Sequence, residues 1–144
     1  AAGMFVTPKH LDVALDFATL RQIDAALGSG VVMVFDTSED MKAVLKRIAH
    51  FFKHESCGKC YPCQLGTQRQ MEIIDRLAAG HARPGDLRLL RAIGQTMTDA
   101  SICGLGQTAS SAILTALDRF GYDEASGEFG RFPGASHLHN PTIP

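Results

Sequence analysis

Four segments between residues 37 and 120 place apolar residues at the i, i+3, i+4, i+7 spacing of an amphipathic helix. They cover residues 41–52, 66–79, 87–97 and 109–120. The segments are joined by short connections, which favour antiparallel neighbours. The pattern therefore predicts a mainly α fold, an up-down four-helix bundle over residues 37–120.

The same pattern predicts the buried faces and ends of these helices. Thr37-Ser-Glu-Asp40 precedes the first helix and predicts a hydroxyl cap with an acidic residue three positions later. Gly80 and Gly121 are expected to stop the second and fourth helices. The predicted inner faces are Met41, Val44, Leu45, Ile48, Phe51 and Phe52; Met71, Ile74, Leu77 and Ala78; Leu87, Leu89, Leu90, Ile93 and Met97; Ala109, Ala112, Ile113, Ala116, Leu117 and Phe120.

Residues 1–36 form a separate predicted unit. A short helical pattern with Leu20, Ile23 and Leu27 is followed by a glycine turn and the apolar run Val31–Phe35. Such a run, rich in β-branched residues, predicts a buried strand. One strand makes no sheet, so we expect this unit to be the end of a larger one whose neighbours cover the strand.

Residues 121–144 show no apolar period and contain several Gly, Pro and polar residues. They predict an extended C-terminal tail, or an arm that lies on a partner.

Composition narrows the class of protein. The 144 residues are 45% apolar and 20% charged, with a net charge of −1, so neither nucleic acid nor an anionic membrane is an expected partner. No apolar run reaches the length of a membrane span, and the N-terminus lacks signal-peptide features. We therefore expect a cytoplasmic, reducing location, where four cysteines indicate metal binding more than disulfides.

The cysteines have an informative spacing. Cys57, Cys60 and Cys63 form C-x2-C-x2-C in the connection between the first two helices, and Cys103 lies in the connection between the last two. In an up-down bundle both connections fall at the same end. The topology alone thus predicts that the four thiols converge on one site.

Three kinds of site compete for these cysteines. Structural zinc also takes four cysteines, but usually as two separated pairs. A triple followed by a lone cysteine is typical of iron–sulfur binding, and the residues after Cys63 exclude a two-cluster ferredoxin. The spacing favours one 4Fe–4S cluster over zinc, and both over disulfides.

The surroundings suit a negatively charged centre. Cys63 and Cys103 are each expected to precede a helix, whose free amides and dipole favour thiolates. Lys53, Lys59 and Arg69 could offset further charge. Glycines that would let the backbone approach the centre are Gly58, Gly66, Gly104 and Gly106.

The segment Glu55-Ser-Cys-Gly-Lys-Cys-Tyr-Pro-Cys63, followed by Gly66-Thr67 and Ser101-Ile-Cys-Gly-Leu-Gly106, resembles a known pattern. It is similar to the C-terminal iron–sulfur part of the NADH-binding flavoprotein subunit of respiratory complex I. Diaphorase subunits of NAD-reducing hydrogenases and β subunits of NAD-linked formate dehydrogenases share this part. Residues 1–36 resemble the end of the family's β-grasp, soluble-ligand-binding segment.

The resemblance implies a function. Cys57, Cys60, Cys63 and Cys103 would hold a 4Fe–4S cluster that accepts electrons from NADH through FMN and passes them to further clusters. Implied partners are an FMN/NADH-binding part, a thioredoxin-like 2Fe–2S subunit and a downstream iron–sulfur subunit.

The glycine-rich dinucleotide loop of the family has no counterpart here. Gly28-Ser-Gly30 precedes a predicted strand, whereas a dinucleotide fingerprint follows a strand and opens a helix. We therefore expect FMN and NAD to bind elsewhere in the complex. The alternative function is a structural metal module, holding zinc or iron–sulfur, without redox turnover.

Overall fold

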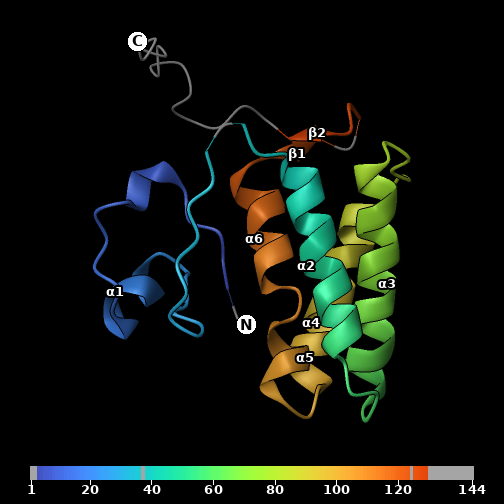
Figure 1. Cartoon of the computed structure of the whole chain (residues 1–144). Coiled ribbons are helices and arrows are strands. Elements are labelled where there is room, and N and C mark those ends of the chain that lie inside the picture. The colour runs from blue at the N-terminus through green and yellow to red at the C-terminus, as the bar shows by residue number, and fades with distance from the viewer. Residues whose placement is uncertain (1–2, 37, 124, 130–144) are drawn as a thin grey trace.

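The structure is a computed structural model that describes residues 3–36, 38–123 and 125–129 (Figure 1). It is mainly helical, as the periodicity predicts. The elements in chain order are η1 (Pro8–His10), α1 (Phe17–Gln22), α2 (Met41–Glu55), α3 (Tyr61–Ala78), α4 (Asp86–Ala100), α5 (Gly104–Thr108), α6 (Ser111–Arg119), β1 (Tyr122–Asp123) and β2 (Glu128–Phe129).

Four helices, α2, α3, α4 and α6, lie side by side around one apolar interior and are called the core helices below (Figure 1). Each contributes side chains with almost no exposed surface, among them Leu45, Ile73, Leu90 and Ile113. Burying a side chain of this size contributes about 1.5–3 kcal/mol. The core helices are therefore held together mainly by this shared interior.

Two residues predicted for the inner faces lie at the surface instead. Phe51 is 46% exposed and Leu89 is 49% exposed. Each sits next to a buried neighbour, Phe52 and Leu90, on the same helix. Successive positions on a helix differ by about 100°, so Phe51 and Leu89 fall at the edge of the apolar stripe while their neighbours lie inside it.

The helix boundaries differ from the prediction in two places. Helix α3 begins at Tyr61 rather than at 66, with Pro62 in its first turn, where a missing N–H leaves no bond unmade. The last predicted helix is preceded by the short α5, and a turn at Ala109–Ser110 separates it from α6. The cap of α2 is the carboxylate of Asp40, which accepts from the Lys42 N–H at 2.9 Å, and not a hydroxyl.

The prediction of a buried strand at Val31–Phe35 is wrong. The structure assigns these residues to neither helix nor strand, and the exposed fractions of Val31 to Val34 are 65% or more. Within the described chain no other strand lies beside them. An apolar run becomes a strand only where a hydrogen-bonding neighbour exists.

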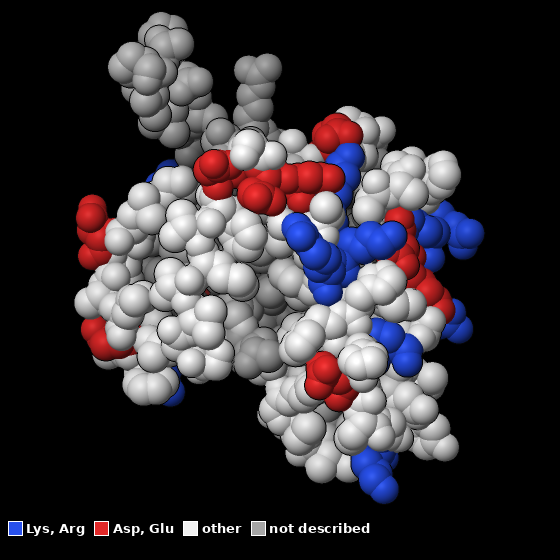
Figure 2. All heavy atoms as spheres, in the orientation of Figure 1, with Lys and Arg blue, Asp and Glu red and all other residues white. Residues whose placement is uncertain are grey.

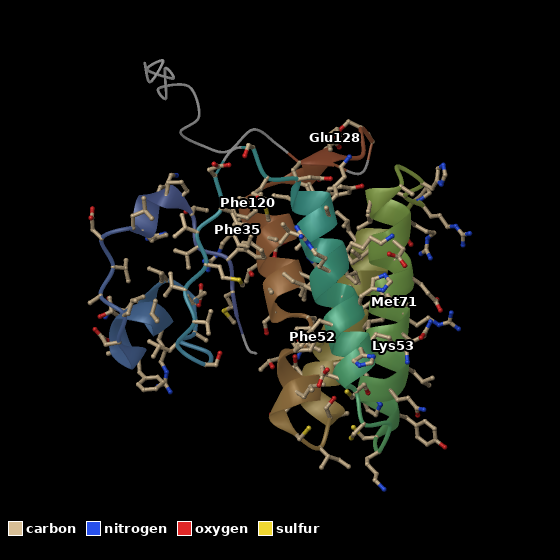
Figure 3. All side chains as sticks on the ribbon, in the orientation of Figure 1. Phe35, Phe52, Lys53, Met71, Phe120 and Glu128 are labelled. Atoms are coloured by element: carbon tan, nitrogen blue, oxygen red, sulfur yellow. The ribbon has the colours of Figure 1, made fainter. Side chains whose placement is uncertain are left out.

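The N-terminal unit is attached to the core helices at α6. The Arg119 guanidinium donates to the carbonyls of Phe5 at 2.6 Å, Ile23 at 2.7 Å and Asp24 at 2.9 Å. The Phe5 ring stacks edge-on against Phe120, with centroids 5.6 Å apart. Figure 3 shows Phe120 beside Phe35, whose ring also contacts Phe5. The Phe5 N–H also donates to Thr115 Oγ1 of α6 at 3.1 Å, so hydrogen bonds and a small aromatic group together make this attachment.

The prediction of an extended tail is wrong at its start. Strands β1 and β2 pair antiparallel as a short hairpin, and Tyr122 is buried against Phe129, with centroids 5.1 Å apart. Glu128 pairs with Lys42 at the start of α2. The rest of the predicted tail, residues 130–144, lies outside the described residues.

Charged side chains of both signs are interspersed on the face that Figure 2 shows. Several of them form ion pairs between helices, such as Lys46 with Asp75 at 3.3 Å and Arg91 with Asp118. Exposed pairs of this kind contribute little to stability, about 0–1 kcal/mol each.

One ion pair is buried. The side chain of Asp86, 5% exposed, accepts from the Arg76 guanidinium at 2.7 Å and from the Arg83 N–H at 2.9 Å. Burial acts to raise the pKa of Asp86, but these hydrogen bonds act the other way and the net pKa is lowered. The carboxylate therefore ties the end of α3 to the start of α4.

We expect Asp86→Asn to lower the free energy of unfolding by about 1–3 kcal/mol at pH 7, because Arg76 loses its buried partner. A lowered carboxyl pKa stabilises the fold above the unfolded-state pKa of about 4, and this stabilisation is lost as the pH falls through the folded-state pKa. The difference between variant and parent should therefore shrink below about pH 4. Urea unfolding at a series of pH values measures the loss of stability at pH 7 and its decrease at low pH. Asp118→Asn, at an exposed ion pair, is the control and should change the free energy of unfolding by less than about 1 kcal/mol.

Candidate metal centre

The two cysteine-bearing connections lie at the same end of the core helices, as the topology predicts (Figure 1). One joins α2 to α3 and contains Cys57 and Cys60. The other joins α4 to α5 and contains Cys103. The turn that links α3 to α4 lies at the opposite end. Segments 40 residues apart in the sequence therefore meet in space.

The four cysteines differ in position and exposure. Cys60 is the N-cap of α3, and Cys63 sits in its first turn, 5% exposed. Cys103 is the N-cap of α5 and is exposed. Cys57, in the loop between α2 and α3, is exposed as well. The prediction for Cys103 is confirmed, whereas at α3 the capping cysteine is Cys60 rather than Cys63.

Backbone amides from both connections act on Cys60. The N–H of Ile102 has the largest effect, followed by the N–H of Cys63, and together they lower the pKa of the Cys60 thiol. Ile102 directly precedes Cys103. The thiol of one connection is therefore within reach of the backbone of the other.

Cys63 shows the opposite shift. Burial is the main cause that raises the pKa of its thiol, and a hydrogen bond with Ser56, 3.3 Å from Oγ to Sγ, opposes this in part. The charges of the other three cysteines, Cys60, Cys103 and Cys57, raise the pKa of Cys63 further. The other three cysteines therefore lie close enough to Cys63 for their charges to act on its thiol.

Within residues 3–36, 38–123 and 125–129, no three His, Cys, Asp or Glu side chains are arranged as metal ligands. The structure thus brings the thiols together without arranging them for ligation. The donor set itself fits an iron–sulfur group, because four soft thiolates are its usual ligands. The hydroxyl of Ser101, buried without a hydrogen-bond partner beside these thiols, also fits a site completed by a further group.

The glycines near the site have different roles. A Cβ on Gly106 would lie 2.4 Å from Ser101 Oγ and 2.9 Å from Cys63 Cβ, so α5 packs closely on the cysteine turn. A Cβ on Gly66 would meet Met97 of α4 at 2.5 Å, which makes Gly66 a helix-packing residue. A Cβ on Gly104 would meet no atom within 4 Å. Gly58 adopts a positive φ of 73°, which favours glycine.

Apolar packing supports the site from inside. Phe52, Met97 and Ala109 form a small buried group, and Phe52 and Met97 each lie one helical turn before the end of their helix. Figure 3 shows Phe52 and Lys53 in the half of α2 nearer the cysteine end. Of the basic residues expected to offset charge, Arg69 is paired with Glu72 at 2.6 Å.

Ser56 and Ser101 are functional candidates that the spacing of the cysteines did not reveal. Ser56 is the C-cap of α2, and Ser101 is the C-cap of α4. The signal was present, since each serine stands one or two residues before a cysteine. Only the structure shows that the Ser56 hydroxyl contacts the Cys63 sulfur and that the Ser101 hydroxyl is buried beside Gly106, which also borders Cys63.

Comparison with known proteins decides the family. The model of the NADH-ubiquinone oxidoreductase-F iron-sulfur binding region matches residues 43–125, a range that contains all four cysteines and more than half of the chain. The chain belongs to this iron–sulfur family. The resemblance found in the sequence is thereby confirmed, and the family match supports a 4Fe–4S cofactor.

Relatives in this iron–sulfur family are subunits of larger enzymes. The chain is 38% identical over 119 residues to the NADP-reducing hydrogenase subunit HndC of Solidesulfovibrio fructosivorans. The aligned region covers 83% of this chain and 24% of that protein. It is 39% identical over 117 residues to the mitochondrial NADH dehydrogenase [ubiquinone] flavoprotein 1 of Dictyostelium discoideum, covering 80% and 24%. The chain thus spans about a quarter of the length of these relatives.

A solved structure shares the fold of this family member. A chain in the crystal structure of NAD+-reducing [NiFe]-hydrogenase in the H2-reduced state aligns with a TM-score of 0.70 and 36% identity. The alignment covers 81% of this chain and 19% of that one. Among the described residues, no helix is long and apolar enough to cross a membrane.

We expect Gly106→Ala to destabilise the chain by about 1–2 kcal/mol, because overpacking against two buried neighbours outweighs the helix propensity of alanine. Urea unfolding followed by circular dichroism measures the change. Gly104→Ala is the matched control in the same helix and should be neutral or slightly stabilising. Equal effects of the two substitutions would contradict the close packing of α5 on Cys63.

Proposed function

We propose that this chain carries one 4Fe–4S cluster, held by Cys57, Cys60, Cys63 and Cys103, in an electron-transfer module. The observation that carries the proposal is that all four cysteines fall in the matched iron–sulfur binding region, on two connections at one end of the core helices or, for Cys63, in the helix turn that follows. The cluster, when bound, supplies one-electron acceptance and donation.

The protein residues have separate tasks in this proposal. Cys60 is the N-cap of α3, and the N–H groups of Ile102 and Cys63 favour its thiolate. Cys103 is the N-cap of α5. Cys63 is buried and excludes water from one side, whereas Cys57 and Cys103 face the surface. An exposed side is what electron exchange with a neighbouring protein needs.

The proposal assigns the parts of the chain as follows. Residues 37–120 are an up-down four-helix iron–sulfur domain. Residues 1–36 are the C-terminal portion of a β-grasp-like segment, and residues 121–144 are a C-terminal extension whose start folds as the β1–β2 hairpin.

The complex is proposed from the relatives. Their names place them in NADH- or NADP-linked enzymes, and the chain spans about a quarter of their length. Electrons would come from NADH through FMN in a part of the complex outside this chain. They would pass to further iron–sulfur centres, through a thioredoxin-like 2Fe–2S subunit or a downstream iron–sulfur subunit.

We expect Cys103→Ser to lose most of the bound iron and acid-labile sulfide after anaerobic reconstitution, because one of four thiolate ligands is removed. Iron and sulfide assays with the visible spectrum measure this. Leu89→Ser, a polar change at an exposed position of α4, is the control and should retain the full content. Full iron and sulfide in Cys103→Ser would refute the four-cysteine ligand set, and a colourless chain that binds zinc alone would refute the redox function.

We also expect the purified 144-residue chain to hold no FMN and to show no NADH-dependent reduction of artificial acceptors. The reason is that its sequence contains no glycine-rich turn between a strand and a helix that could receive a dinucleotide phosphate. Flavin fluorescence after acid release and an NADH oxidation assay measure the two properties. Stoichiometric FMN would contradict this assignment.

A further inference from the structure

Two serines occupy equivalent positions around the cysteine site. Ser56 ends α2 and Ser101 ends α4, and both have extended backbones, with ψ of 119° and 143°. The N–H of each donates to a carbonyl one turn earlier, Phe52 and Met97, at 3.1 Å. The chain therefore leaves each helix in the same way and holds a hydroxyl at the edge of the thiol group.

The hydroxyl of Ser56 lies 3.3 Å from the sulfur of Cys63. In the free thiol either atom can donate this hydrogen bond. When Cys63 serves as a ligand its sulfur is a thiolate and has no proton to give, so Ser56 Oγ must be the donor.

Ser101 is 6% exposed, and its hydroxyl lacks a hydrogen-bond partner in the described chain. Its backbone groups have partners, because the N–H donates to the Met97 carbonyl and the carbonyl accepts from Gln107 Nε2 at 3.0 Å. A buried hydroxyl without a partner is unfavourable, so this one favours an acceptor close by. Its oxygen lies beside Gly106, which also borders Cys63. The N–H groups of Ile102 and Cys63 do most to lower the pKa of the Cys60 thiol, and the Ser101 hydroxyl adds to this although its geometry falls short of a hydrogen bond.

We propose that the hydroxyls of Ser56 and Ser101 donate hydrogen bonds to the ligand sulfurs of Cys63 and Cys60 and thereby raise the reduction potential of the centre. The inference rests on the proposed function, since it concerns the centre assigned there. A hydrogen bond to sulfur is stronger when the centre carries one more negative charge, so it stabilises the reduced state more than the oxidised state. Ser56 and Ser101 are positioning residues that act through the ligands.

The test uses the reconstituted full chain and a redox titration followed by electron paramagnetic resonance. Ser56→Ala and Ser101→Ala should keep their iron and sulfide, and each should shift the equilibrium toward the oxidised form by up to about tenfold, which is about 59 mV for a one-electron couple. Ser56→Thr keeps a hydroxyl and should restore the parent potential. Ser110→Ala, which removes a hydroxyl 2% exposed at the start of α6, is the matched control and should leave the potential unchanged.

The outcomes separate the two proposals. A parent chain that assembles no cluster overturns the proposed function, and this inference with it. Intact clusters with unchanged potentials in both alanine variants overturn only the inference. Should Ser101→Ala fail to hold the cluster, the pair Ser56→Ala and Ser56→Thr decides: a potential lowered by alanine and restored by threonine supports the proposal, and equal potentials overturn it.

Discussion

The contact between Gly66 and Met97 determines how closely the two halves of the site approach. A Cβ at position 66 would lie 2.5 Å from Cγ and Sδ of Met97, closer than van der Waals contact. Helices α3 and α4 are therefore in direct contact here. Gly66 lies one turn after Cys63, and Met97 lies one turn before Ser101. The separation of the two cysteine-bearing connections is therefore fixed by helix packing just inside them. In the loops themselves, Cys57 and Cys103 are exposed.

Periodicity predicted the main helices well because burial of an apolar stripe is a local property of the sequence. It misplaced the start of α3 because Tyr61 and Pro62 add no apolar signal, although proline is favoured in a first turn. It also gave no sign of the turn before α6, since the apolar stripe is continuous through Ala109 and Ala112 while the backbone changes direction.

The site could be predicted in its chemistry but only partly in its geometry. The spacing of Cys57, Cys60 and Cys63 indicates an iron–sulfur cluster rather than zinc. The up-down order of the helices predicts that Cys103 lies at the same end. Which cysteine caps a helix depends on the first turn of α3, which the sequence did not reveal. The run Val31–Phe35 illustrates the general limit: strand formation depends on a neighbour, and apolar sequence alone does not supply one.

The attachment of the N-terminal unit has a consequence for sequence variation. Arg119 binds the main-chain carbonyls of Phe5, Ile23 and Asp24 and uses none of their side chains. Every residue type carries the same carbonyl, so the bond to position 23 does not depend on its side chain, whereas position 5 also needs its ring against Phe120. Arg119 itself has no substitute with a comparable fork of donors.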